Sequence, residues 1–308
     1  MHRTNHKNGE WKRYKEVSVP WAQYDSYRCS EYKRIIDLKE LVCELDKPVQ
    51  RREFQLSHLV VLLLLKILFG VSYRGIASAT KDLKIYQILG LKRAPCYKTI
   101  QNTFQFLTED FLKGINQKLL PNATPLAGMD SSGLKTHCKG AWVVIRFHKP
   151  QQKRDFKKVH LFVDLVSKKI LNCVMTKGAA SDHKQVKRLL KGCRWIRVDI
   201  ILGDTGYDTR ECFHEITQFG ALPGIPVRRN AVTKGYGCPS RRQAVVAQHQ
   251  NYALWKHQMQ YSMRCVVESI FSGIKRRFGE SLFSIKERFR KVEMWLRSVL
   301  RNVLIYPR

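Results

Sequence analysis

The chain lacks the cysteine spacings of a zinc-binding or disulfide-rich module. Its nine cysteines are scattered along 308 residues, and none forms the Cys-x2-4-Cys pair that is typical of zinc fingers and ribbons. An odd number without regular spacing also argues against a disulfide framework. We therefore predict that most of these cysteines are reduced and buried, where a thiol packs as a small hydrophobic side chain.

The sequence also has no apolar segment of membrane-spanning length. The longest apolar run, Leu59–Phe69, is short and is interrupted by Lys66, whereas a transmembrane helix needs about 20 apolar residues. No apolar signal core lies near Met1. Internal repeats and low-complexity tracts are absent as well. We expect a soluble cytoplasmic protein with no membrane partner.

Acidic residues are scarce. The chain has 25 Asp and Glu against 56 Lys and Arg, giving a formal net charge of +31, and most of the excess lies in residues 121–308. A chain this basic repels itself unless a polyanion neutralises it. Nucleic acid is the natural partner, because phosphate contacts release counterions and give affinity that is independent of sequence. Ribosomal and membrane-surface proteins share this charge, so it indicates only a class of partner.

The first part of the chain is predicted to be helical. Residues 1–50 mix charged and aromatic residues with weak periodicity, which indicates an arm or short helices. In residues 51–120, Ser57 is a candidate N-cap for a helix that Gly70 can terminate. Further short helices are predicted over residues 73–79, 81–89 and 97–107. This series resembles a helix-turn-helix, and Lys98 beside the last helix favours DNA contact. A helical bundle used for dimer contacts fits the same pattern.

The second part, residues 121–308, has the pattern of an α/β domain. Pro121 and Pro125 break the helical pattern and mark a domain boundary. An Asp208–Glu211 capping box is predicted to open a helix. Strands are predicted over residues 126–129, 141–147, 159–166, 169–175, 198–202 and 221–227, and helices over 182–190, 208–219 and 285–304. We therefore expect a mixed sheet flanked by helices and preceded by an α-helical N-terminal domain.

Two aspartates follow predicted strands directly. Asp130 lies in Gly-Met-Asp-Ser-Ser-Gly after the first strand, and Asp204 follows the apolar strand 198–202. Sites in α/β sheets are built at the carboxyl ends of strands. Small neighbours such as Gly128 would let a ligand approach the backbone. Each aspartate alone would more often be a turn or cap residue.

A third acidic residue lies in a predicted helix. Tyr261, Arg264, Glu268 and Lys275 are spaced so that, at about 100° per residue, they share one helix face. An Arg–Glu pair at i,i+4 on a solvated face is the ordinary interpretation. The apolar residues on the other faces, and the run of basic residues that includes Arg276, instead favour a stripe that faces a specific partner.

The spacing Tyr-x2-Arg-x3-Glu-x6-Lys resembles the signature of a large group of insertion-sequence DDE transposases. The segments around Asp130, Lys158-Val-His160 and Asp204 resemble that family too, in the same order. The resemblance covers residues 121–283 well, residues 54–107 loosely and residues 1–50 hardly at all. One departure is Thr205, because Gly or Ala usually follows the second aspartate in relatives.

The resemblance implies an RNase H-like fold with one site for DNA cleavage and strand transfer. Asp130, Asp204 and Glu268 would be catalytic and would hold two Mg²⁺ or Mn²⁺ ions, since carboxylate oxygens suit hard cations. Tyr261, Arg264, Lys275 and Arg276 would contact DNA. The implied partners are double-stranded DNA, as element ends and target, and a second copy in a homodimer; such a protein would be associated with the nucleoid. The alternatives are another RNase H-like nuclease, such as a resolvase, and an inactive DNA-binding derivative of a transposase.

Other segments yield lesser predictions. The basic loop 228–242, which includes Arg228 and Arg229, is predicted to contact the DNA backbone, as is the basic segment 149–158. Ser181 or Asp182 is predicted to be a helix N-cap. Trp255 is expected in the core, with stacking on an extruded base as the alternative.

Overall fold

The computed structural model describes residues 5–7, 10–12, 21–45, 53–136, 156–233 and 237–305, with side chains from residue 33 onward. The predicted strand at 141–147 and most of the basic segment 149–158 lie outside the described residues. Residues 157 and 158 of that segment belong to a strand and not to a loop.

The centre of the fold is a mixed six-stranded sheet with the order β5-β4-β3-β6-β7, in which β8 also pairs with β3. β3 pairs with β4, and β4 with β5, in antiparallel directions, whereas β6 and β8 run parallel to β3, and β7 runs parallel to β6. This arrangement confirms the expected fold class, an RNase H-like mixed sheet flanked by helices. The strands are β3 (Ala123–Thr136), β4 (Phe156–Asp164), β5 (Ile170–Lys177), β6 (Arg197–Leu202), β7 (Leu222–Gly224) and β8 (Ser281–Leu282).

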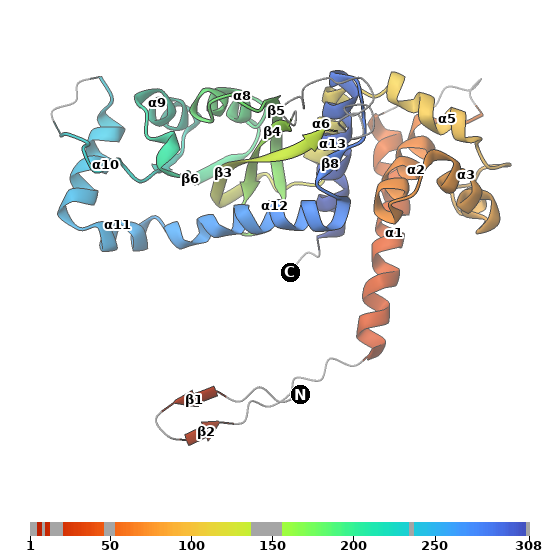
Figure 1. Cartoon of the computed structure of the whole chain (residues 1–308), viewed down its shortest axis with the longest axis horizontal. Coiled ribbons are helices and arrows are strands. Elements are labelled where there is room, and N and C mark those ends of the chain that lie inside the picture. The colour runs from red at the N-terminus through yellow and green to blue at the C-terminus, as the bar shows by residue number, and fades with distance from the viewer. Residues whose placement is uncertain are drawn as a thin grey trace, which may run out of the picture.

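Helices cover both faces of the sheet (Figure 1). Helices α8 (Val186–Lys191) and α9 (Arg210–Phe219) lie on one face, and α12 (Cys265–Phe278) lies along the other. Alternation along β4 explains the two layers, because Phe162 faces the α8–α9 core while the alternate residues Val159, Leu161 and Val163 face the α12 core. The strands predicted over residues 159–166 and 169–175 are present as β4 and β5, which pair as an antiparallel hairpin with Lys168 in the left-handed conformation at φ 60°.

The N-terminal helices share one apolar core with the α12 side of the sheet. Helix α2 is apolar on nearly all sides and is buried accordingly, and Gly70 ends it with φ 65°, as predicted. The predicted N-cap was wrong, since Gln55 precedes the helix and Ser57 is buried within it. The helices are α1 (Trp21–Leu45), α2 (Leu56–Phe69), α3 (Tyr73–Asp82), α4 (Ile85–Ile88), α5 (Tyr97–Asn102) and α6 (Glu109–Lys118).

Two helices differ from the sequence prediction in this half of the chain. A single 25-residue helix, α1, replaces the arm or short helices expected before residue 50, and it follows the short hairpin β1 (Asn5–Lys7) and β2 (Glu10–Lys12). Helix α6 was not predicted at all; Thr108 caps it by accepting a hydrogen bond from Phe111 N.

Downstream of the sheet centre, the predicted Asp208–Glu211 capping box is also absent. Thr209 caps α9 by accepting a hydrogen bond from Cys212 N, which frees Asp208 for another role. The buried Asp208 carboxylate instead binds Arg241 at 2.7 Å and accepts a hydrogen bond from the backbone N of Arg228. The remaining helices are α10 (Pro239–Gln250), α11 (Tyr252–Gln258) and α13 (Glu287–Leu304), the last close to the predicted range 285–304 and with Val292, Leu296 and Leu300 buried. Among the described residues, no single helix has both the length and the apolar character to cross a membrane.

Candidate active site

Strands β3 and β6 place Asp130 and Asp204 side by side. The two strands run parallel with Gly128 opposite Leu202, so each aspartate lies two residues beyond that pair. The prediction that Asp130 ends its strand was wrong. β3 continues to Thr136, because Asp130 and the residues after it pair with β4. Asp204 does follow the end of β6, where its Oδ1 accepts a hydrogen bond from Gly206 N at 2.8 Å.

Gly128 lets helix α12 approach the sheet. A Cβ atom there would stand 2.7 Å from Cγ2 of Val267 and 3.0 Å from Leu165, which is too close for a side chain at that position. The space at Gly128, which was predicted to admit a ligand, is instead occupied by Val267 of α12. Because Glu268 follows Val267 directly, this contact sets the position of the Glu268 backbone relative to β3.

The guanidinium of Arg264 joins two of the three acidic residues. Its Nη1 lies 3.1 Å from Asp130 Oδ2 and its Nη2 lies 2.5 Å from Glu268 Oε1. The ordinary i,i+4 pair is thus present, but the same guanidinium also reaches across to β3. Arg264 lies in a 3-10 segment, η4 (Tyr261–Arg264), and not in the regular helix that the spacing predicted. Gln260, with φ 49°, separates this segment from α11.

Burial raises the pKa of Asp130, and its surroundings act in both directions. The hydrogen bond from Ser131 N and the charge of Arg264 lower the pKa, whereas the charges of Asp204 and Glu268 raise it. The three carboxylates are therefore close enough to repel one another. Such a cluster is stabilised by positive charge, which Arg264 supplies here.

The acidic residues suit a hard divalent cation by their chemistry. All the donors are carboxylate oxygens, as Mg²⁺ and Mn²⁺ prefer, and their mutual repulsion favours a cation among them. In the part of the chain that the structure describes, no three Asp, Glu, His or Cys side chains stand close enough to hold one ion. Arg264 lies between Asp130 and Glu268, so binding of an ion by both would require this guanidinium to move.

A pocket of about 400 Å³ opens between β3 and α12. Lys275 lies at its side and donates a hydrogen bond to Ser132 Oγ at 2.8 Å, while the exposed Arg276 extends the cationic wall. Glu268 is the most exposed of the catalytic candidates in the pocket, at 57% of its side chain. The lining residues are Asp130, Ser131, Ser132, Glu268, Phe271, Ser272, Lys275, Arg276 and Glu280. Asp204 is not among them, so the pocket contains two of the three acidic residues.

Tyr261 ties η4 to the end of β6. Its hydroxyl donates a hydrogen bond to the carbonyl of Gly203 at 3.3 Å, next to Asp204. Burial raises the pKa of Tyr261 to about 12, so the phenol stays neutral at physiological pH. Its ring packs on Trp255, which is 3% exposed and stacks on Tyr252. This confirms the prediction of a core tryptophan and makes Trp255 a support for Tyr261.

The remaining predicted DNA contacts lie outside the pocket. Lys98 is exposed on α5. Arg228 and Arg229 are exposed on the segment after β7, where the backbone of Arg228 is held by Asp208. The structure therefore groups Tyr261, Arg264, Lys275 and Arg276 with the acidic residues and places these three elsewhere.

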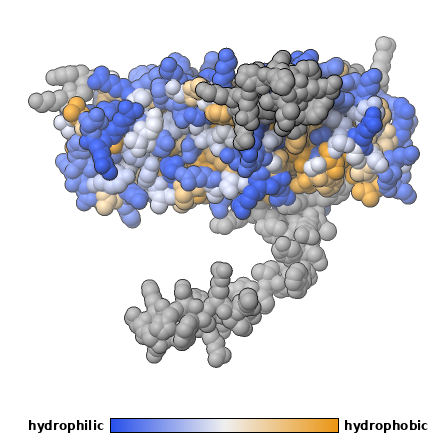
Figure 2. Space-filling view, viewed as in Figure 1, coloured by the Kyte–Doolittle hydropathy of each residue, from blue (hydrophilic) through white to orange (hydrophobic). Residues whose placement is uncertain are grey.

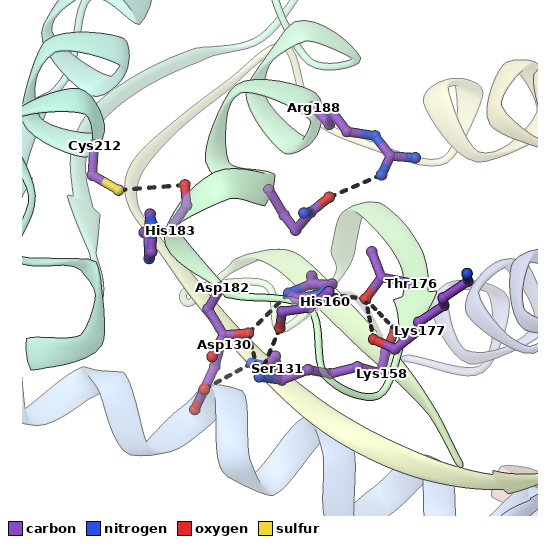
Figure 3. Close-up of polar contacts among 12 residues, drawn as sticks. Asp130, Ser131, Lys158, His160, Thr176, Lys177, Asp182, His183, Arg188 and Cys212 are labelled. Carbon is purple, nitrogen blue, oxygen red and sulfur yellow. Dashed lines mark hydrogen bonds and ion pairs between the residues drawn. The ribbon is translucent and has the colours of Figure 1, made fainter. Parts of the chain in front are cut away.

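Sequence analysis missed a polar cluster beside Asp130 (Figure 3). Asp182 stands at the N-cap position of the 3-10 segment η2 (His183–Gln185), as predicted, but its side chain does not cap it; its Oδ1 lies 2.7 Å from Lys158 Nζ and 3.3 Å from His160 Nδ1. The other ring nitrogen of His160 contacts Thr176 Oγ1 at 2.9 Å. Burial lowers the pKa of His160 to about 4, although Asp182 acts in the opposite direction. The i,i+2 spacing of Lys158 and His160 on one strand face was the available signal.

Comparison with known proteins identifies a family for this chain. The family model described as "Transposase DDE domain" matches residues 124–303, more than half of the chain. Among solved structures, a cryo-EM structure of the piggyBac transposase synaptic complex with hairpin DNA has a TM-score of 0.41 and 10% identity, covering 89% of this chain and 72% of that one. The crystal structure of a pre-cleavage Mos1 transpososome has a TM-score of 0.24 and 9% identity, covering 84% and 80%. By the match over residues 124–303, the chain belongs to the transposase DDE domain family.

Proposed function

We propose that this protein is an active DNA transposase that binds the terminal repeats of an insertion sequence, cuts the DNA there and joins the freed end to target DNA. The observation that carries the proposal is the convergence of Asp130 and Glu268 on Arg264, with Asp204 just beyond the end of the neighbouring strand β6. Strand cleavage would be hydrolysis, in which water attacks a phosphodiester and releases a 3′-OH. Strand transfer would then be attack of that 3′-OH on a target phosphodiester, so no covalent enzyme intermediate is needed.

Asp130, Asp204 and Glu268 would hold two Mg²⁺ or Mn²⁺ ions. When bound, such ions lower the pKa of the attacking oxygen and stabilise charge on the leaving oxygen of an in-line displacement. The neighbouring side chains act on the substrate itself. Arg264 and Lys275 would contact phosphate oxygens, since Arg264 projects into the site from η4 and Lys275 from α12. The neutral phenol of Tyr261 would hold the end of β6, and Asp204 with it, in place.

Other basic residues would supply affinity without chemistry. Arg276 extends the wall of the pocket, and Lys98, Arg228 and Arg229 are exposed and able to follow a DNA backbone. The surface seen in Figure 2 is largely hydrophilic, with smaller apolar patches between. A homodimer is expected because two element ends must be joined. Loss of an acidic residue would favour the inactive derivative, but Asp130, Asp204 and Glu268 are all present.

Isosteric amide variants test the assignment. Asp204→Asn and Glu268→Gln should abolish cleavage of element-end DNA in the presence of Mg²⁺ and leave DNA binding within a few-fold of wild type, because phosphate contacts supply most of the affinity. Asp199→Asn is the matched control, since Asp199 is an exposed carboxylate on β6, the strand that leads to Asp204, and among the described residues it pairs with Arg197 alone. Cleavage by either site variant at the rate of the control would refute the assignment.

A further inference from the structure

Helix α13 carries two arginines, four residues apart, in contrasting surroundings. Arg297 is 1% exposed, and both of its terminal nitrogens have partners: Nη2 binds Glu293 at 2.7 Å and the carbonyl of Ser281, and Nη1 binds the carbonyl of Gly279, while its buried Nε has no partner among the described residues. Arg301, one turn further along, has no such set of partners among the described residues. Its one hydrogen bond there runs from Nη2 to the carbonyl of Lys168 at 3.5 Å, and its buried Nε has no partner.

Arg301 lies at a second pocket, of about 420 Å³, between the C-terminal ends of α12 and α13. Arg276 and Arg277 of α12 also line this pocket, and both are exposed. Its other lining residues are glycine or apolar, so the described wall carries three guanidinium groups and no carboxylate. Burial, with the charge of Arg277, lowers the pKa of Arg301 to about 10. Arg301 nevertheless stays charged at neutral pH.

A half-buried guanidinium with an unused donor needs an anion or water to complete its hydrogen bonds. Arginine presents a planar fork of donors that matches the oxygens of a phosphate group. The chemistry of the lining also restricts the ligand. The side chains of Phe278, Leu304 and Ile305 carry no polar group, so the pocket offers nothing to bind a positively charged part of a ligand. A phosphate group is therefore favoured over a zwitterionic ligand, which carries a positive as well as a negative charge.

Arg276 connects this pocket to the active site, since it lines both pockets. Glu268 and Arg276 lie on the same helix, so about 12 Å of helix axis separates them, at about 1.5 Å per residue. That length corresponds to roughly three base-pair steps along a duplex, at about 3.4 Å each. A DNA strand held at the active site can thus reach the second pocket within a few nucleotides.

We propose that the pocket formed by Arg276, Arg277 and Arg301 binds a backbone phosphate of DNA a few nucleotides from the site of cleavage. The inference rests on the proposed function, because it takes its ligand to be the DNA strand that enters the active site. It adds Arg277 and Arg301 as binding residues and gives the C-terminal end of α13 a role in holding DNA. A free phosphate ion would satisfy the same donors, so the experiment has to separate the two sources.

Binding of fluorescent element-end duplex by the full chain, titrated over a series of salt concentrations, tests the proposal. Arg301→Gln should bind about tenfold more weakly than wild type, and its plot of log K against log salt should be shallower by about one unit, because one phosphate contact is lost. Arg301→Lys, which keeps the charge, should recover part of the affinity. Arg288→Gln is the control; Arg288 is exposed on the same helix and contacts the carbonyl of Gln105, outside the pocket.

A second variant covers the case in which Arg301→Gln fails to fold, as judged by circular dichroism melting. Arg277→Gln changes an exposed residue on the opposite wall and should reduce affinity and salt slope in the same way. Affinity and slope equal to those of Arg288→Gln in the folded variants would overturn the inference. A second combination of results would also overturn it. In that case inorganic phosphate raises the melting temperature of the wild type relative to chloride at equal ionic strength, while Arg301→Gln and Arg277→Gln leave DNA binding unchanged, so that the pocket binds free phosphate and not DNA. Failure of the wild-type chain to bind or cut any DNA would instead contradict the proposed function.

Discussion

A Cβ atom on Gly128 would stand 2.7 Å from Cγ2 of Val267, so strand β3 and helix α12 meet at a position that tolerates no side chain. Asp130 lies two residues after the glycine and Glu268 one residue after the valine. We expect Gly128→Ala to push α12 outward, and with it Glu268. Overpacking should cost about 1–3 kcal/mol of unfolding free energy, and misplacement of Glu268 should reduce cleavage by about 100-fold. Urea unfolding and single-turnover cleavage measure the two effects.

Gly273 provides the control for that substitution. It lies in the same helix, and no atom lies within 4 Å of the position its Cβ would take. Gly273→Ala should therefore stabilise the protein by up to about 1 kcal/mol, because alanine is the better helix former. If both variants shifted stability in the same direction and by similar amounts, close contact at Gly128 would not be the cause.

On the proposed function, Arg264 would compete with metal ions for the carboxylates of Asp130 and Glu268 that it joins. Arg264→Gln should lower stability by about 1 kcal/mol in EDTA, a small loss because the groups are partly exposed. Added Mg²⁺ should then stabilise the variant more than the wild type, since no guanidinium opposes ion binding. Thermal melting with and without 10 mM Mg²⁺ measures the difference. Identical Mg²⁺ effects in the two proteins would show that the ions bind elsewhere.

His160 makes the fold sensitive to acid. Its pKa falls from 6.5 to about 4 in the folded chain, so the unfolded chain binds the proton more readily. The contribution of neutral His160 to the free energy of unfolding is fully present above pH 6.5 and is lost as the pH falls towards 4. The loss has an upper limit of about 3 kcal/mol. His160→Gln should flatten this part of the stability profile, measured by urea unfolding between pH 4 and 7. An unchanged slope in the variant would assign the acid sensitivity to other groups.

The buried pair of Glu293 and Arg297 should be a strong structural contact. Glu293 is 5% exposed and also accepts hydrogen bonds from the backbone N of Phe283 and Ser284. Arg297→Met would leave this carboxylate buried without its cation, at a cost of about 3–5 kcal/mol. The double variant Glu293→Leu with Arg297→Met should be less unstable than the sum of the single changes. Additive losses in urea unfolding would mean that the two side chains act independently.

Local chemistry predicted much of the sheet and part of the site. The hairpin at Ser167-Lys168, the strand before Asp204 and the edge strand β7 all followed from strand formers between turn residues. The grouping of Arg264 with Glu268 followed from their spacing, even though η4 is not a regular helix. The reason is that Arg264 already has α-helical backbone angles where α12 begins, so the four-residue spacing to Glu268 still places both side chains on one side.

Tertiary contacts decided what the sequence did not predict. Ser131-Ser132-Gly133 has the composition of a turn, yet β4 pairs with it and extends β3 beyond Asp130. Asp182 has the position of an N-cap, but Lys158 and His160, distant in sequence, bind its carboxylate instead. Helix α1 was not predicted from the weak pattern over residues 1–50, although in its described part Ile35, Leu38 and Val42 pack into the core that other helices complete. Each outcome depends on a partner that local patterns do not reveal.

The function of the N-terminal helices is best tested by point substitutions on α5. Removal of residues 1–120 would expose the core that α2 and α6 share with α13, so a truncated chain would report on folding and not on DNA. Lys98 and Gln101 are exposed on α5, and side chains there can reach base edges if the helix enters the major groove. Lys98→Ala with Gln101→Ala should lower the ratio of element-end to scrambled-duplex affinity by about tenfold and leave binding to the scrambled duplex within a few-fold of wild type.

Lys118→Ala on α6, paired with Glu44, is the matched control. An unchanged ratio in the α5 variant, together with loss of dimers in sedimentation, would favour the alternative that these helices form a dimer contact.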